Sequence, residues 1–315
     1  MKKILEVKNI GKTYSSRLGP FKALEQISFD GHEGEVLGLL GPNGSGKTTI
    51  IKSIASLMEF DEGEIFINGK DNVKQRAKIL PDLGAVLDGN RNIYWRLTTL
   101  ENINYFAGIK GLDKNKIKDK IERLLEMLKL KEIRNKEVRL LSRGMKQKVA
   151  IACSLIHEPS LILLDEPTLG LDIEISRDME QWVRNFAKKE QKCILVTSHD
   201  MDFIEKVCDR VIIIQKGKIV YEGAVNEIKK KHASIKKIQV TLNDHLNENL
   251  VKSLKNICEL DYEIIEEKSI LSFKLKNIDF LHSIMNFFNS NKIRLLNIQT
   301  TETEFEDIFM NIIKR

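Results

Sequence analysis

Residues 41–48 read Gly41-Pro42-Asn43-Gly44-Ser45-Gly46-Lys47-Thr48, the most informative segment of the chain. The run before it, residues 35–40, is almost continuously apolar and predicts a buried strand, and Thr49–Met58 after it predicts a helix. A glycine-rich loop between a strand and a helix directs several backbone N–H groups and the positive helix end at one point. The spacing therefore predicts a loop that binds nucleotide phosphates.

Two side chains of this loop have separate expected tasks. Lys47 is expected to reach the outer phosphates as a catalytic cation, and the Thr48 hydroxyl is expected to bind Mg²⁺. ATP and Mg²⁺ are therefore the predicted ligands. The residues expected to contact the nucleotide here are Gly41, Pro42, Asn43, Gly44, Ser45, Gly46, Lys47, Thr48 and Thr49. The alternative is a chance glycine-rich turn, which leaves the flanking strand and helix without a purpose.

Two adjacent carboxylates follow a second predicted buried strand. Residues 161–164 form an apolar run of strand length, and Asp165 and Glu166 come directly after it. Asp165 is suited to hold Mg²⁺ through water, and Glu166 is suited to orient and polarise an attacking water. Taken alone, the pair also fits the polar end of a strand entering a loop. Downstream of a phosphate loop, we expect a metal-binding Asp and a catalytic Glu.

A histidine is expected at the same edge of the sheet. The predicted buried strand at residues 193–196 leads into Thr197-Ser198-His199-Asp200. His199 is predicted to emerge beside the phosphate loop and to hydrogen-bond the γ-phosphate during catalysis. A single His is more often structural, and that is the alternative reading of His199.

A second helix start suited to anions lies at residues 141–147, which read Leu-Ser-Arg-Gly-Met-Lys-Gln. Ser142 can cap the helix that follows, and Gly144 lets the backbone approach an anion. A single chain has no obvious use for two phosphate-binding helix ends on one nucleotide.

Together and in this order, these motifs resemble the nucleotide-binding domain of the ABC transporter family, over residues 1 to about 222. The resemblance implies an α/β P-loop NTPase fold with an antiparallel β edge and a helical subdomain. It identifies residues 141–145 as the signature and Gly170-Leu171-Asp172 as the D-loop. It also identifies Tyr14 as the residue that stacks on adenine, with an exposed strand-end Tyr as the alternative.

The resemblance also explains the two anion-binding helix ends. In the family, the signature of one domain faces the ATP held by the phosphate loop of another, so Ser142 and Gly144 are expected to act in trans. This sequence has one phosphate loop and one signature. Its expected partner is therefore a second copy of itself or a related ATPase subunit.

Two motifs depart from the common family pattern. The signature has Arg143 and Met145 in place of Gly and Gln but retains Gly144, so we expect its function to survive. Asp88 stands where most relatives have the Gln of the Q-loop. A carboxylate binds Mg²⁺ more strongly but cannot donate a hydrogen bond. Asp88 is expected to contact the nucleotide and the metal, with a solvated loop acid as the alternative.

The segment after Asp88, residues 91–98, contains Trp95, one of two tryptophans in the chain. By the resemblance, a coupling helix of a membrane partner docks here, and aromatic and Arg side chains are typical interface anchors. The alternative is that Trp95 packs the helical subdomain.

The length of 315 residues predicts two domains, which we place at residues 1–230 and 231–315. Residues 1–8 alternate as an edge strand does, and residues 98–157 form a helical subdomain in which Asp113 caps one helix. After residue 231 the pattern is βαββαβ, which predicts a small α+β, ferredoxin-like accessory domain, closed by an amphipathic helix at residues 305–313.

The chain is thus predicted to be the ATPase subunit of an exporter, working with a separate transmembrane permease because no apolar run is long enough to span a bilayer. It is expected in the cytoplasm, on the inner face of the membrane, with four cysteines as free thiols. A soluble ABC ATPase acting on ribosomes or nucleic acid is the alternative. The net charge of +6 comes without a dense basic cluster, so no nucleic-acid partner is expected.

Overall fold

The chain forms two compact units, Met1–Val225 and Asn226–Arg315, each with its own sheet structure and core. The computed structural model describes residues 2–16, 19–89, 93–113, 115–232, 236–242, 246, 248–257, 260–265, 268–275, 278–301 and 305–314. The division falls at the start of helix α8 (Val225–His232), slightly before the predicted boundary at residue 230.

The first unit contains an antiparallel sheet in the strand order β2-β1-β4-β5. Its strands are β1 (Lys3–Ser16), β2 (Gly19–His32), β4 (Glu62–Ile67) and β5 (Lys70–Asp71). The prediction that residues 1–8 form an edge strand is wrong, because β1 pairs with both β2 and β4. The alternation arises because one face of β1 is buried, while Glu6 and Lys8 form an ion pair on the solvated side.

A six-stranded sheet in the order β10-β9-β3-β8-β7-β6 forms the centre of this unit. Its strands are β3 (Val36–Leu40), β6 (Leu83–Val86), β7 (Leu161–Asp165), β8 (Cys193–Thr197), β9 (Arg210–Gln215) and β10 (Lys218–Ala224). All neighbours are parallel except the hairpin β9–β10. Every residue of β3, β7 and β8 is buried, so the predicted buried strands are confirmed.

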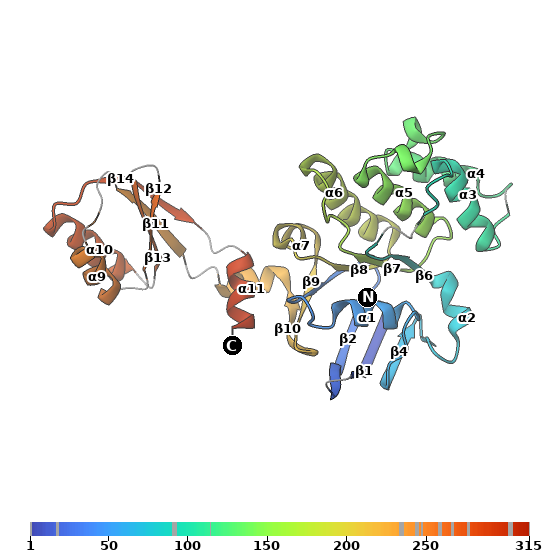
Figure 1. The fold of residues 1–315 in the computed structure, drawn as a ribbon, viewed down its shortest axis with the longest axis horizontal. Coiled ribbons are helices and arrows are strands. Elements are labelled where there is room, and N and C mark those ends of the chain that lie inside the picture. Colours follow the sequence, from blue (N-terminus) through green and yellow to red (C-terminus); the bar gives the residue numbers. More distant parts are fainter. Residues whose placement is uncertain are drawn as a thin grey trace. The chain divides into compact units, whose positions relative to one another are not determined.

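Helix α1 (Lys47–Ile54) lies between the two sheets (Figure 1). Its Ile50, Ile51 and Ile54 are fully buried in a core shared with strands of both sheets. The helix begins and ends earlier than predicted, since Ser56 already has a left-handed φ of 55°. The other helices that accompany the sheets are α2 (Arg76–Ile79), α6 (Ile173–Glu190) and α7 (Met201–Val207).

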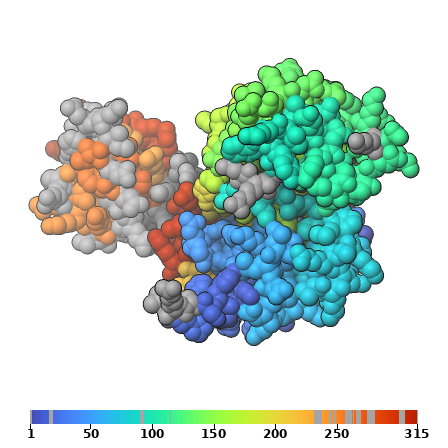
Figure 2. Space-filling model, turned by 45° about the vertical axis from the view of Figure 1, so that its right-hand side comes forward, coloured from blue at the N-terminus to red at the C-terminus, as the bar shows by residue number. Residues whose placement is uncertain are grey.

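The predicted helical subdomain is present as α3 (Thr99–Ile109), α4 (Lys118–Met127) and α5 (Arg143–Leu155). In Figure 2 it forms the green lobe of the first unit, apart from the blue lobe of the antiparallel sheet. The expected cap is wrong: the Asp113 carboxylate accepts a hydrogen bond from the Asn115 N–H (3.0 Å) in a turn before α4. The apolar positions predicted for this helix are buried, namely Ile117, Ile121, Leu124, Leu125 and Leu128.

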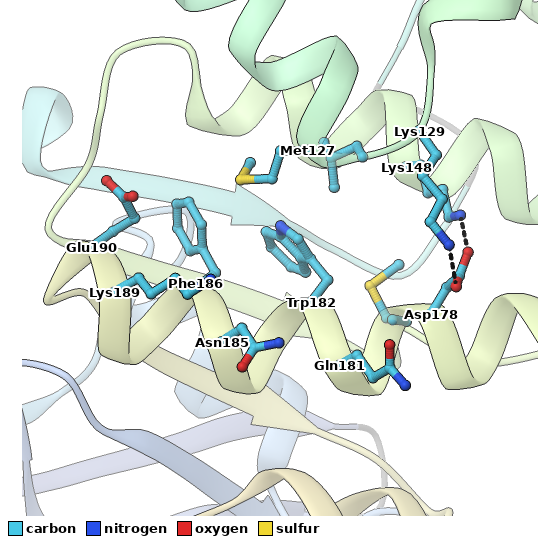
Figure 3. Close-up of a pocket in the computed structure, with 12 residues that line it drawn as sticks. Met127, Lys129, Lys148, Asp178, Gln181, Trp182, Asn185, Phe186, Lys189 and Glu190 are labelled. Atoms are coloured by element: carbon cyan, nitrogen blue, oxygen red, sulfur yellow. Dashed lines mark hydrogen bonds and ion pairs between the residues drawn. The ribbon is translucent and has the colours of Figure 1, made fainter.

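A cleft of about 250 Å³ lies where α6 meets α4 and α5, and the stacked rings of Trp182 and Phe186 line it (Figure 3). At one end the Asp178 carboxylate of α6 pairs with Lys148 of α5 (3.0 Å) and with Lys129 just after α4 (2.8 Å). The Lys148 pair fastens α5 to α6, and the Lys129 pair fastens the end of α4 to α6.

The second unit confirms the predicted order βαββαβ. Its elements are β11 (Lys236–Leu242), α9 (Glu248–Ile257), β12 (Leu260–Ile265), β13 (Lys268–Leu275), α10 (Ile278–Ser290), β14 (Leu295–Thr301) and a final helix α11 (Phe305–Ile313). The sheet is antiparallel with the order β12-β13-β11-β14, which is the ferredoxin-like arrangement. Its core joins side chains of β11 and β13 to those of α9 and α10.

None of the described helices has the length and apolar character needed to cross a membrane. Cys153, Cys193 and Cys208 are buried free thiols as predicted, and burial raises their pKa values. Cys258, like Arg91 and Asn92 of the expected docking segment, lies outside the described residues.

Candidate active site

The loop at residues 41–48 owes its shape to glycines that no other residue could replace without strain. Gly46 has φ 112°, and a Cβ there would lie 2.9 Å from the Ala23 carbonyl oxygen. Gly41 has φ 156°, and a Cβ there would lie 2.2 Å from the Ile214 carbonyl oxygen. The loop therefore packs tightly against its neighbours at Gly41 and Gly46, while residues 42–44 between them are exposed just before the start of α1.

Residues 43–49 of this loop line a cavity of about 590 Å³. The other residues of its lining are Tyr14, Phe21, Ala23, Asp88, Asp165, Glu166, Leu169 and His199. The cavity thus joins a helix N-terminus, one amine, three carboxylates and two aromatic rings. This set of groups fits a nucleotide with its polyphosphate on the loop and a divalent cation held by hydroxyl and carboxylate oxygens.

The Lys47 amine is held by the loop's own carbonyl groups. It donates hydrogen bonds to the carbonyl oxygens of Gly41 (2.7 Å) and Pro42 (3.2 Å). Burial lowers the pKa of Lys47, while the nearby carboxylates of Glu166 and Asp165 act to raise it. A polyphosphate entering the cavity would offer this amine stronger, charged acceptors.

Asp165 and Glu166 are positioned by Thr197, which lies directly opposite Asp165 in the parallel pair β7–β8. The buried Thr197 hydroxyl donates to Asp165 Oδ1 (2.5 Å) and accepts from the Glu166 N–H (3.0 Å). Glu166 itself has a left-handed φ of 51°. Thr197 therefore fixes the Asp165 carboxylate and the backbone of Glu166 at once, a role that its place in the Thr197-Ser198-His199 sequence did not reveal.

His199 contacts Glu166 directly. Its ring Nδ1 lies 2.8 Å from Glu166 Oε2, and its backbone N–H donates to the same oxygen (3.3 Å). The structure thus places His199 at the cavity, as predicted, and shows the carboxylate as its present partner. The ring remains largely exposed, so it is free to turn toward a phosphate.

Tyr14 lines the same cavity from β1. Its hydroxyl lies 2.8 Å from Met58 Sδ and 3.4 Å from Thr49 Oγ1. The neighbouring strand places Phe21 directly opposite Tyr14, and the Phe21 ring is exposed at the cavity. Sequence reasoning missed Phe21, although an exposed aromatic residue one hairpin away from Tyr14 was a usable signal.

Asp88 follows β6 and is exposed in the lining of the cavity, together with Asp165 and Glu166. The parallel pairing of β6 with β7 brings these chain segments to the same sheet edge. The structure therefore places Asp88 in the same cavity lining as Asp165 and Glu166.

The second predicted anion-binding helix start, at the N-terminus of α5, differs from the phosphate loop in its surroundings. Ser142 is the N-cap of α5 and its hydroxyl accepts from the Met145 N–H (3.3 Å), as predicted. Gly144 is buried against Ile175 of α6, where a Cβ would lie 2.6 Å from the Ile175 side chain. Among the described residues, neither Ser142 nor Gly144 lines the cavity of the phosphate loop. Within one chain, these two residues therefore lie outside the lining of the phosphate-loop cavity.

Comparisons with known proteins agree with these features. Residues 24–169 match the family described as ABC transporter. The chain is 42% identical to the ABC transporter ATP-binding protein NatA of Bacillus subtilis, over 66% of this chain and 84% of that protein. It is 31% identical to the bacitracin transport ATP-binding protein BcrA of Bacillus licheniformis, over 99% of this chain and 98% of that protein.

Solved structures are similar over the first unit. A dimeric, post-hydrolysis structure of an ATP-binding cassette bound to ADP and Pi aligns with a TM-score of 0.64 and 28% identity, over 70% of this chain and 99% of that one. The ATP-binding subunit of another ABC transporter aligns with a TM-score of 0.64 and 30% identity, over 72% and 92%.

Proposed function

Because the chain belongs to the ABC transporter family of ATP-binding, ATP-hydrolysing subunits, we propose that it drives a separate membrane permease, as an exporter. The observation that carries this proposal is the single cavity that joins Lys47, Glu166 and His199. Similarity over nearly the whole chain to a bacitracin transport subunit supports the transport role, and export is the proposed direction. The proposed location is the inner face of the membrane, through the permease.

In the proposed reaction, the backbone N–H groups of the loop from Asn43 onward and the Lys47 amine bind the polyphosphate. Mg²⁺, held by Thr48, Asp165 and Asp88, would neutralise charge that develops on the phosphates. Glu166 accepts the proton of the attacking water, and the hydrogen bond of its N–H to Thr197 orients its backbone for this role. His199 then turns from Glu166 toward the γ-phosphate.

The nucleotide site is completed in this proposal by a second copy, or by a related subunit. One chain presents its loop cavity and its Ser142–Gly144 helix start as separate features. The related cassette with ADP and Pi is a dimer. Two chains therefore give each nucleotide a loop from one subunit and a signature from the other.

Coupling to the permease is proposed to pass through the segment around Trp95. The rings of Tyr94, Trp95 and Tyr105 are all exposed, and Tyr94 meets Tyr105 edge to face at 4.6 Å. Such exposed aromatic groups are typical anchors for a protein partner. The Lys146 amine lies over the Trp95 ring at 5.0 Å, and Lys146 belongs to the signature helix α5.

The backbone fastens this aromatic segment to the residues just before the signature. The Val138 N–H donates to the Leu97 carbonyl (3.0 Å), and the Arg139 N–H donates to the Trp95 carbonyl (2.9 Å). A partner that moves the aromatic segment therefore moves the start of α5 with it.

The Glu166→Gln variant tests the catalytic proposal. It removes the general base but keeps the shape of the side chain, so we expect ATP turnover to fall at least about a hundredfold while ATP-dependent dimers accumulate. Turnover by phosphate release and dimerisation by sedimentation are the measurements. Glu132→Gln, an exposed acid outside the cavity, is the matched control. Turnover at the wild-type rate in Glu166→Gln would contradict the assignment.

The permease proposal is tested by photo-cross-linking from position 105 in membranes of the native host. We expect an integral membrane protein to be captured from Tyr105, and no capture from the exposed Glu132 on the same subdomain. Ribosomal protein or nucleic acid as the captured partner would instead support the soluble alternative and overturn the proposal.

A further inference from the structure

The two outer strands of the second unit's sheet differ in how they are protected. An edge strand presents unpaired N–H and C=O groups, which proteins commonly guard with charges or prolines. β12 carries Asp261 and Glu263. β14 reads Leu-Leu-Asn-Ile-Gln-Thr-Thr, with neither charge nor proline, and β11 is its only partner among the described strands. The edge at β14 is therefore open to another strand.

The side chains of β14 are also uncovered. All described side chains from residue 294 to residue 299 are exposed, including Leu295 (36%), Leu296 (52%) and Ile298 (44%). Ile298 pairs with Val240, which is fully buried in the core. The apolar layer of this unit thus continues to its edge and ends at an uncovered aliphatic side chain.

An added strand would extend this layer. It would satisfy the outer backbone groups of β14 and cover Ile298 on the side where Val240 already packs. The pairing of β14 with β11 is regular from Asn297 to Thr301, and its one register shift lies at the start of the strand. A straight segment is therefore available for pairing.

We propose that β14 pairs antiparallel with β14 of a second copy of this chain, giving one sheet continuous across both accessory units. This inference rests on the proposed function in one respect: nucleotide-driven dimerisation supplies the second copy at high effective concentration. A two-fold axis makes such pairing self-complementary and antiparallel. Pairing of β14 with its copy brings no charged residues together, whereas β12 carries two acidic residues, so its symmetric pairing would place like charges across the interface.

The test is sedimentation of the full-length chain without nucleotide. We expect a monomer–dimer equilibrium that Ile298→Lys weakens at least about tenfold, because a symmetric interface loses the contact twice and sets the two new charges near each other. Ile264→Lys is the matched control, since Ile264 is also an exposed isoleucine (57%, against 44% for Ile298) and lies on the opposite edge. Thermal unfolding of both variants at the wild-type temperature would show that the domain remains folded.

Two results would overturn the pairing: equal self-association of the Ile298→Lys and Ile264→Lys variants, or wild-type assembly that grows beyond the dimer with concentration. Disulfide cross-linking gives a second measurement. Each chain carries Cys258→Ser and one introduced cysteine at a position from 295 to 299, while the buried Cys153, Cys193 and Cys208 stay in place. We expect disulfide dimers at one or two of these positions and none from Glu263→Cys on β12. Failure of the nucleotide sandwich is separate, because it would appear as loss of ATP-dependent dimers in Glu166→Gln.

Discussion

The two units of this protein use their sheets in opposite ways. In the first unit, parallel strands end at one edge, and the polar groups there hold one another, as Asp165 and Glu166 do through Thr197. In the second unit, an antiparallel sheet has an apolar layer on one face and an outer strand without charge. The first arrangement gathers the polar groups of the site at the ends of strands. The second leaves the side of an edge strand available for pairing with another strand.

This difference predicts which substitutions affect turnover and which affect assembly. In the first unit, a polar side chain at a strand end should influence the rate even where its removal costs little stability. In the second unit, the removal of a polar side chain should change stability at most and leave the rate unchanged. Paired variants, one in each unit, test that contrast directly.

The largest effect is expected for His199→Ala. Its ring contacts the catalytic carboxylate at 2.8 Å, so its loss removes a group that acts at the reacting centre. We expect kcat to fall by about a hundredfold or more, in the range of a lost acid–base group. The matched variant is His282→Ala, an exposed His on α10 of the second unit, for which kcat should not change. Steady-state ATPase assays compare the two, and similar losses in both would break the contrast.

A smaller loss of rate is expected for Thr197→Val. Val keeps the shape of Thr but removes the hydroxyl that joins Asp165 to the Glu166 N–H. We expect kcat to fall about tenfold to a hundredfold and stability to fall by about 1–3 kcal/mol, since buried polar groups lose their partner. Thr197→Ser keeps the hydroxyl and should restore most of the rate.

The corresponding hydroxyl in the second unit is that of Ser269, which is fully buried and lies 3.1 Å from the Tyr262 hydroxyl. Ser269→Ala should cost stability of similar size and leave kcat unchanged. Thermal unfolding and ATPase rates on the same samples separate the two effects. A Thr197→Val variant that loses stability but keeps its full rate would show that Thr197 only supports the fold.

The sequence revealed the site's groups but not the contacts between them. Motif spacing was enough to predict Lys47 and Glu166, because a loop or a strand end carries its chemistry in consecutive residues. Thr197 was missed because its partner lies 32 residues away, and only the register of β7 against β8 places them opposite. Likewise, the alternation in β1 shows that one face is buried but not how many strands flank it.

Acid should weaken the first unit through His157. Burial lowers the pKa of His157 from 6.5 to about 4. Its Nε2 lies 2.9 Å from the Leu83 carbonyl oxygen, and its Nδ1 is buried with no hydrogen-bond partner among the described residues, so a proton added there would have no acceptor among them. Because the unfolded chain binds the proton more readily, the stability it contributes is present above about pH 6.5 and is lost as the pH falls toward 4.

The measurement is thermal unfolding of the wild type and His157→Gln as a function of pH. We expect the wild type to lose about 1–2 kcal/mol more than the variant over this range, allowing for partial solvent exposure of the ring. His282→Gln in the second unit should follow the wild type. Parallel pH profiles for all three proteins would remove His157 as the acid-sensitive group.

The smallest effect is expected at Asp178, which ties α6 to the helical subdomain in Figure 3. Lys148 is only 12% exposed and Lys129 is 71% exposed, so the two ion pairs on one carboxylate are not equal. Asp178→Asn should cost about 1 kcal/mol or less, and Lys148→Met should account for most of it, because exposed pairs contribute little. Lys129→Met should be almost neutral and sensitive to salt. Equal losses at Lys129 and Lys148 would mean that net charge, and not the tie between α5 and α6, determines the stability here.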